Sequence, residues 1–259
     1  MKKIISFLLV GVLWSTTALM AQQKTEQKSP DSINRFDANN LKTGYWEEKE
    51  GEFLNKGYYL NNKKTNNWIS YFSNNNNIRK IEFYSNGQKN GISIQFDRKG
   101  KISEIDYYKN GILNGPVTTY NQYNELPISE INYLNGKKNG VVRINYDNGK
   151  PQEESYYRDD LKNGTCKWYS KSGHLVAEYN YKNGVFEGLQ KTFYDNDTVQ
   201  QVNSYSNNEL SGDYREYYRN GRFKVSGNYV NGKKEGVWTE YDELGKAVRT
   251  TKYKAGVPK

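Results

Sequence analysis

A unit of 24 or 25 residues recurs along most of the chain, and its clearest copy reads YVNGKKEGVWTEYDELGK from Tyr229 to Lys246. A unit this short cannot enclose a core of its own, so neighbouring copies must stack to bury apolar surface. Tyrosine opens every copy, and we expect these residues to form a structural ladder: Tyr59, Tyr84, Tyr108, Tyr133, Tyr157, Tyr181, Tyr205, Tyr229 and Tyr253.

Each copy also has three slots that hold only Gly, Asn or Asp, at three, seven and sixteen residues after the tyrosine. These residues best tolerate a left-handed backbone, so we expect positive φ at every slot. Two turns per unit leave room for two strands of about six residues each, which favours a repeating antiparallel hairpin. The third slot holds Asn75, Gly100, Asn124, Gly149, Gly173, Asp197, Gly221 and Gly245.

A second aromatic residue recurs between the turns, at Tyr71, Phe96, Tyr120, Tyr169, Phe193, Tyr217 and Tyr241. One copy has Asn145 there and Tyr146 one place later, which predicts a local β-bulge. A two-stranded ribbon is marginal alone, whereas stacked aromatic pairs supply the missing burial. The predicted fold is all-β, an open single-layer array of antiparallel hairpins over residues 41–259.

The amino-acid composition excludes several ordinary classes of protein. The chain has 24 Tyr and 9 Phe with a mean hydropathy of −1.02, so a layered aliphatic core is not expected. Its single cysteine cannot form an intramolecular disulfide. The formal net charge of +9 invites a nucleic-acid interpretation, but the lysines recur as part of the turns and do not cluster. No nucleic-acid partner is therefore predicted.

The first residues have the pattern of an export signal. Lys2 and Lys3 precede an apolar run from Ile4 to Trp14, and small residues follow before Gln22. We expect residues 1–21 to be cleaved, because the apolar run is too short to span a bilayer. No cysteine follows that would carry a lipid anchor, so an exported periplasmic or secreted product is predicted. Residues 22–40 are polar and aperiodic and predict a flexible linker.

The string Y-x-N-G-x-x-x-G-x-W-x-x-Y, from Tyr229 to Tyr241, resembles the MORN-variant repeat of YwqK-type, antitoxin-like bacterial proteins. The resemblance implies a twisted single layer of hairpins with an aromatic-lined groove that contacts protein or lipid. It implies no catalytic residue. The export signal is a departure from the family, and it argues against an antitoxin that acts in the cytoplasm.

The residues that most often carry chemistry occupy ordinary positions of the unit. Cys166 falls in a strand slot that holds Trp68 in another copy, and His174 follows a turn glycine. Neither a Cys/His pair nor a zinc site can be assembled convincingly. The sequence leaves three further sites open: a Ser/His/Asp triad through His174, a pair of carboxylates for glycoside hydrolysis, and a calcium site. No sequence pattern supports any of them. No catalytic, cofactor or metal site is predicted.

Four aspartates begin the loops of their copies, and we expect each to accept a backbone N–H and fix the turn. They are Asp97, Asp147, Asp195 and Asp242. The Asn-rich stretch from Ser73 to Asn77 is interpreted as a lengthened turn.

Apolar residues stand at two inner hairpin tips where other copies have lysine pairs, namely Ile112, Leu113, Val185 and Phe186. They either pack against the next hairpin or contact a partner. The favoured function is an exported, non-enzymatic module that binds a protein or an envelope polymer through its aromatic face and its tips. Neutralisation of a toxin and peripheral contact with anionic lipid are the alternatives, and the oligomeric state is left open.

Overall fold

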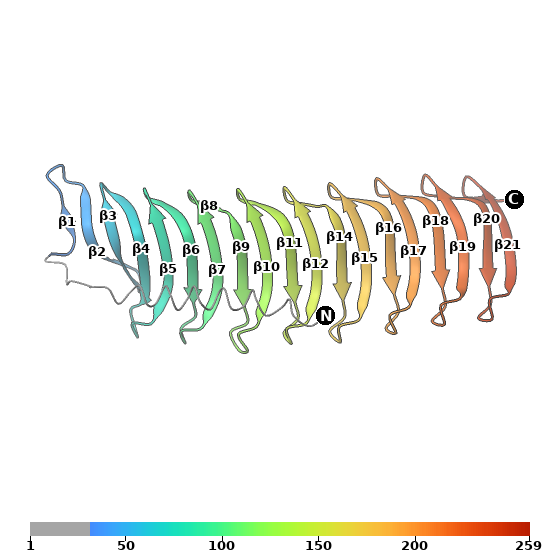
Figure 1. The fold of residues 1–259 in the computed structure, drawn as a ribbon, viewed down its shortest axis with the longest axis horizontal. Helices are drawn as coiled ribbons and strands as arrows, with labels where there is room; N and C mark the ends of the chain where they lie inside the picture. The colour runs from blue at the N-terminus through green and yellow to red at the C-terminus, as the bar shows by residue number, and fades with distance from the viewer. Residues whose placement is uncertain (1–31) are drawn as a thin grey trace, which may run out of the picture.

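The computed structural model describes residues 32–259, which form a single open antiparallel sheet of 22 strands without a helix (Figure 1). The all-β hairpin array expected from the sequence is confirmed. No helix within this range is long and apolar enough to cross a membrane. The predicted export signal, residues 1–21, and most of the predicted linker lie outside the described residues.

The strands run in chain order along the sheet, two for each unit of sequence, except that two units have the second strand divided, into β8 and β9 and into β13 and β14. Their bounds are β1 Arg35–Phe36, β2 Lys42–Glu50, β3 Phe53–Leu60, β4 Lys63–Phe72, β5 Ile78–Ser85, β6 Gln88–Phe96, β7 Ile102–Lys109, β8 Ile112–Leu113, β9 Gly115–Tyr120, β10 Pro127–Leu134, β11 Lys137–Asn145, β12 Pro151–Arg158, β13 Leu161–Lys162, β14 Gly164–Tyr169, β15 Leu175–Lys182, β16 Val185–Phe193, β17 Val199–Ser206, β18 Glu209–Tyr217, β19 Phe223–Val230, β20 Lys233–Tyr241, β21 Ala247–Lys254 and β22 Val257–Pro258. Two-residue turns lie along the upper edge in Figure 1, here called the turn edge. The lower edge, here called the loop edge, carries longer loops except between β2 and β3, which are joined by residues 51–52.

The turn edge is built from turns such as Asn86–Gly87, where φ is 51° and 81°. Two consecutive positive φ values define the type I′ turn that matches the twist of a hairpin. The Gly87 N–H donates to the Lys64 carbonyl of the preceding hairpin at 2.8 Å. Where the slot holds Asn208, its side-chain oxygen also accepts the Phe186 N–H at 2.7 Å. Positive φ at the first and second slots is confirmed, and the first slot also links neighbouring hairpins.

The loop edge differs from expectation in two copies. Positive φ occurs at Asn76 and Glu125 instead of the predicted Asn75 and Asn124. Those loops belong to the 25-residue copies and contain one extra residue, so the left-handed position moves by one. The side chain of Asn75 instead accepts the Asn77 N–H at 3.0 Å. The lengthened turn from Ser73 to Asn77 is confirmed as the connection between β4 and β5.

The prediction for the loop aspartates is half right. Asp97 and Asp242 each accept two backbone N–H groups of their loop at 2.8–3.0 Å. Asp147 and Asp195 lie one position later in the loop, where they form ion pairs of 2.8 and 2.5 Å with a cation of the next loop. The turns there are held by the side chains of the asparagines that follow these aspartates.

Tyr146 is a loop residue and not a displaced member of the second aromatic ladder. It opens its loop, and its hydroxyl donates to the Tyr169 carbonyl of the next copy at 2.8 Å. Tyr194 and Tyr218 make the same bond. A register shift does lie beside Asn145, but the same shift recurs in other copies. The prediction of a bulge particular to this copy was therefore wrong.

The end of the predicted flexible linker also differs from expectation, because residues 35–36 form β1 and pair with β2. The Asn34 N–H donates to the Tyr45 carbonyl at 2.9 Å, and the Phe36 ring lies 5.1 Å from Trp46. This segment covers part of the first edge strand, which would otherwise leave backbone groups unpaired.

Side chains alternate along the strands, which gives the sheet two faces, and no part of residues 32–259 covers either face with a second layer. We call the one that carries the tyrosine ladder the tyrosine face and the other the reverse face. Trp46, Trp68, Val142, Cys166 and Trp238 are buried on the tyrosine face, and Ile81, Ile94 and Ile105 on the reverse face. The second aromatic ladder begins on the reverse face, where the Lys56 ammonium lies 5.7 Å from the Tyr71 ring.

Candidate binding faces of the sheet

The tyrosine ladder runs along one face of the whole array, and every member is half-buried. Each tyrosine pairs across its hairpin with the residue five positions later, as Tyr84 does with Lys89 and Tyr181 with Phe186. The seven tyrosines predicted to be structural all take this position: Tyr84, Tyr108, Tyr133, Tyr157, Tyr181, Tyr205 and Tyr229.

Lysines lie over the aromatic rings of this face. The Lys64 ammonium is 4.1 Å from the Trp68 ring centroid and 5.5 Å from that of Tyr84, and Lys234 makes the same arrangement in the last copy. The second lysine of each tip pair is therefore packed on rings instead of extending into solvent. Burial and the neighbouring Glu48 raise the pKa of Tyr59 to about 12, so its phenol stays neutral at physiological pH.

One slot at the centre of the tyrosine face, here called the tryptophan slot, holds side chains of different size along the array. Trp68 is 3% exposed and covers Gly57, where an added Cβ would lie 2.4 Å from the indole. Trp238 covers Gly227 in the same way. Cys166 occupies the tryptophan slot in the middle of the array and is fully buried, as expected for a strand residue.

A buried polar group replaces tryptophan in β5–β7. Ser93 takes the tryptophan slot and pairs across the sheet with Glu82 and Asp106. Burial raises the pKa of Asp106, and burial together with the Asp106 charge raises that of Glu104. Burial opposes ionisation of Glu82, yet a hydrogen bond from Lys89 and the charge of Lys80 leave its pKa below the ordinary value.

The four predicted contact residues start the strands that follow the turns, and the structure divides them between the faces. Ile112 and Val185 lie on the reverse face at the turn edge, whereas Leu113 and Phe186 lie opposite ladder tyrosines. The Phe186 ring contacts three tyrosine rings, with centroids 4.9, 5.4 and 5.6 Å away. Phe186 is thus part of the aromatic surface, whereas the adjacent Val185 lies on the other face.

The reverse face carries two different central rows that the sequence analysis missed. The isoleucine strip is Ile69, Ile81, Ile94 and Ile105, and the charge ladder is Glu130, Arg143, Glu154, Lys167, Glu178 and Lys191. Successive charges in the ladder alternate in sign, and all neighbours except Glu154 and Lys167 form ion pairs of 3.2–3.8 Å. The signal was present in the sequence, because these residues occupy equivalent strand positions in successive copies.

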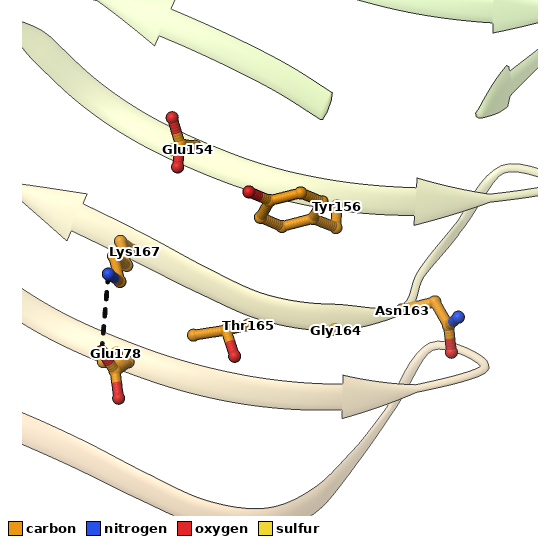
Figure 2. Close-up of a pocket in the computed structure, with 7 residues that line it drawn as sticks. All are labelled: Glu154, Tyr156, Asn163, Gly164, Thr165, Lys167 and Glu178. Carbon is orange, nitrogen blue, oxygen red and sulfur yellow. Dashed lines mark ion pairs between the residues drawn. The ribbon is translucent and has the colours of Figure 1, made fainter. Parts of the chain in front are cut away.

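A shallow hollow of about 470 Å³ lies over the charge ladder (Figure 2). Glu154 and Tyr156 come from β12, Lys167 from β14 and Glu178 from β15. Lys167 and Glu178 are joined at 3.8 Å. Asn163, Gly164 and Thr165 complete the lining.

A second hollow, of about 190 Å³, lies on the tyrosine face near the last copies. Burial and the Glu216 charge raise the pKa of Tyr214 to about 12 there. The Lys234 ammonium already covers the Trp238 ring in this hollow. Its lining is Tyr214, Glu216, Val225, Tyr229, Lys234, Trp238, Glu240, Thr251 and Tyr253.

The structure places His174 at an exposed loop, where its Nδ1 lies 3.1 Å from Asp197. Within residues 32–259, no cluster of three or more His, Cys, Asp or Glu side chains is arranged to hold a metal ion. Cys166 is on the tyrosine face and is fully buried.

Between residues 32 and 259, antiparallel hairpins stacked in chain order into one open sheet define a β-repeat protein. A family model described as the MORN repeat variant matches residues 89–110, 138–159, 162–183 and 186–207. Four units of this chain within residues 89–207 are therefore MORN-variant repeats, as the sequence motif indicated. MORN repeats generally form modules that bind proteins or membranes, and they are not typically enzymes. A search of curated proteins found no match.

Proposed function

We propose that the protein is an exported, non-enzymatic module whose tyrosine face binds an extended partner, either a protein or an envelope polymer. The observation that carries this proposal is the uninterrupted tyrosine ladder on a face that nothing within residues 32–259 covers with a second layer. Half-buried aromatic rings offer large contact area at little conformational cost, which is why they are enriched in binding interfaces.

The aromatic surface is densest between β14 and β21. Ring centroids lie 5.2 Å apart for Trp168 and Tyr179, 5.4 Å for Phe186 and Tyr205, and 5.1 Å for Tyr214 and Trp238. The copies repeat every two strands, or about 10 Å, so equivalent rings recur at an even spacing. A long partner could therefore make the same contact in several copies.

Export is a proposal that rests on the N-terminal sequence. Its basic start, short apolar run and small residues before Gln22 have the pattern of a cleaved signal. Cell fractionation and N-terminal sequencing test it. An intact Met1 on protein recovered from the cytosol would contradict export.

Binding is tested with adjacent residues that face opposite ways. Phe186→Leu removes a ring at a slot where Leu113 and Leu210 occur naturally, so the fold should persist. Val185→Gln is the control, because Gln88 occupies its slot in another copy. Affinity capture from the native envelope fraction, after cross-linking, should yield the partner with wild type and with the Val185 variant.

The Phe186 variant should bind the captured partner about 30-fold more weakly, as expected for losing an aromatic anchor. Unchanged binding by this variant, together with loss in the Val185 variant, would place the contact on the reverse face and contradict the proposal. A toxin or effector as the captured partner would make the module a neutraliser that acts outside the cytoplasm.

A further inference from the structure

The charge ladder on the reverse face has an even number of members, and their signs alternate. In strand order the members are Glu130, Arg143, Glu154, Lys167, Glu178 and Lys191. Acidic and basic side chains are equally frequent, so the ladder has no net charge. A surface of one sign, such as a polyanion, would meet as many like charges as unlike ones, and it does not fit this row.

Such a row is complementary to a reversed copy of itself. When a second molecule faces the first with its array running the opposite way, the first member of one ladder lies opposite the last member of the other. The second member then lies opposite the fifth, and the third opposite the fourth. Each of these pairs joins a carboxylate to a cation, whereas an odd number of alternating charges would place like charges opposite each other.

A twofold axis that runs parallel to the strands, between β12 and β14, produces this arrangement. It turns the two reverse faces towards each other and keeps the strands of the two sheets aligned, as in ordinary face-to-face packing. Sheets packed in this way lie about 10 Å apart, a distance that a glutamate and a lysine side chain bridge together. A twofold axis along the array would instead place every charge opposite its own copy.

The centre of the ladder has contacts left to make. All other neighbours in the ladder form ion pairs, but Glu154 and Lys167 form none with each other within residues 32–259. These two residues lie beside the twofold axis, where Glu154 of one molecule would face Lys167 of the other. They also line the hollow of about 470 Å³ (Figure 2), which side chains of the second molecule would fill.

The surroundings of the ladder also suit a second layer. Tyr156 and Leu189 each lie two residues along their strand from a ladder charge, so they share its face, and they are 40% and 45% exposed. Thr118 and Val202, the neighbours of the two ends of the ladder, are uncharged. The twofold axis places these two residues opposite each other, so no like charges meet where the ladder ends.

We propose that the reverse face binds a second copy of this chain, with the two arrays antiparallel and the charge ladders face to face. This inference goes beyond the proposed function, which concerns the tyrosine face. Two molecules joined in this way present two tyrosine faces, directed away from each other. A long partner that engages both faces would be held more tightly than by one.

Charge reversal at the centre of the ladder tests the proposal. Glu154→Lys and Lys167→Glu each introduce two like-charge contacts across the twofold axis. The fold should persist, because Lys56 and Glu47 occupy the equivalent positions in β3 and β2 and face each other there. Each variant, purified as the cell processes it, should self-associate about 30-fold more weakly than wild type in sedimentation equilibrium.

A mixture of the two variants is the decisive arm. In a mixed pair the two new charges face each other across the axis, and so do the two native ones, so that every facing pair is unlike. An equimolar mixture should therefore associate with nearly the wild-type dissociation constant. Wild type that stays monomeric at every concentration would overturn the proposal, and so would a mixture that associates no better than the single variants.

The matched controls are Glu243→Lys and Lys246→Glu, which reverse exposed charges at the loop edge and should self-associate like wild type. An equal loss in these controls would overturn the proposal, because net charge alone would then explain the association.

A neutral variant keeps the test valid if a reversed charge destabilises its hairpin. Glu154→Ser with Lys167→Thr uses Ser226 and Thr239, which face each other at the equivalent positions of the last copy. It should self-associate about tenfold more weakly than wild type, because two attractive contacts are lost without new repulsion. Unchanged self-association of this variant would contradict the proposed interface.

Discussion

The first copies and the middle copies share one backbone plan but stabilise it with different side chains. In β2–β7, Trp46 and Trp68 are buried on the tyrosine face, and Ile81, Ile94 and Ile105 of the isoleucine strip are buried on the reverse face. In β10–β16, the same tyrosine-face slot holds Val142, Cys166 and Gln190, and the reverse face carries the charge ladder. Turns, register and tyrosine ladder are common to both regions.

This difference shows which contacts define the repeat and which only strengthen it. Both regions keep the inter-hairpin bond from the first turn slot, for example Gly87 to Lys64 and Gly184 to Lys162, each 2.8 Å. The central rows vary freely, because each copy touches only its neighbours. Apolar burial contributes more stability than exposed ion pairs do, so we expect the first region to be locally more stable.

The largest expected effect is at the tryptophan slot. Trp68→Ala should lower the free energy of unfolding by about 4 kcal/mol, because it removes a buried ring and leaves a cavity over Gly57. Cys166→Ala, at the same slot in the middle region, should cost about 1 kcal/mol. Urea titrations of the two variants give the comparison. Equal losses in the free energy of unfolding would show that this slot contributes equally to the stability of the two regions.

The reverse face gives the next largest contrast. Ile94 and Lys167 occupy the same position of their copies, and Ile94 is 5% exposed. Ile94→Ala should cost about 3 kcal/mol. Lys167→Ala should cost less than about 1 kcal/mol, since its ion pair with Glu178 is partly solvated. Denaturant titrations at low and high salt test both values, and only the Lys167 effect should depend on salt.

A smaller change tests the fit between Trp68 and Gly57. Gly57→Ala places a methyl group within 2.4 Å of the indole and should cost about 2 kcal/mol by overpacking. Ser155 holds the equivalent position in the middle region, so Ser155→Ala is a control without that clash. Adding Trp68→Val, the residue found at Val142, should remove most of the penalty of Gly57→Ala. Additive losses in the double variant would contradict direct contact as the cause.

The smallest predicted effect depends on pH. The raised pKa of Asp106 means that the folded state binds its proton more tightly than the unfolded state does. Its contribution is therefore complete below the unfolded pKa of about 4, and it is lost as pH rises through the folded pKa. Asp106→Asn should remove that loss and flatten the stability profile above pH 4. Thermal melts across this range check it, and a steeper profile in the variant would show that the sign is wrong.

The groups around Asp106 include charges of both signs. The pKa of Glu104 is raised as well. The pKa of Glu82 is lowered, and its carboxylate forms an ion pair with the Lys89 ammonium at 2.6 Å. Glu82 thus contributes stability above its unfolded pKa, which is lost as pH falls through its folded pKa. Glu82→Gln should therefore change stability in the opposite direction to Asp106→Asn at neutral pH.

The repeat and its turns could be predicted because their causes are local. Asn86 and Gly87 fix a type I′ turn by their own backbone preferences, and the 24-residue period places it in every copy. The extra residue near Asn75 could be seen in the spacing. Its effect on φ could not, because the loop can absorb an added residue at more than one place.

The candidate site was predicted less well, because strand register decides which face a residue joins. The sequence suggests that Val185 and Phe186 belong to one tip, but the turn is Asn183–Gly184, and side-chain alternation along β16 places the two residues on opposite faces. The pairing of residues 35–36 with β2 also escaped prediction. Phe36 contacts Trp46 but precedes the first repeat unit, so the sequence period could not predict its position.

Native-state hydrogen exchange tests the central claim, that stability along the open array is local and set by each region's own rows. The backbone amides of β4–β7 should exchange most slowly, and those of β10–β16 should exchange through a separate opening of lower free energy. Ile94→Ala should accelerate exchange in β4–β7 far more than in β10–β16. A single opening free energy for all strands, changed equally everywhere by Ile94→Ala, would contradict the account.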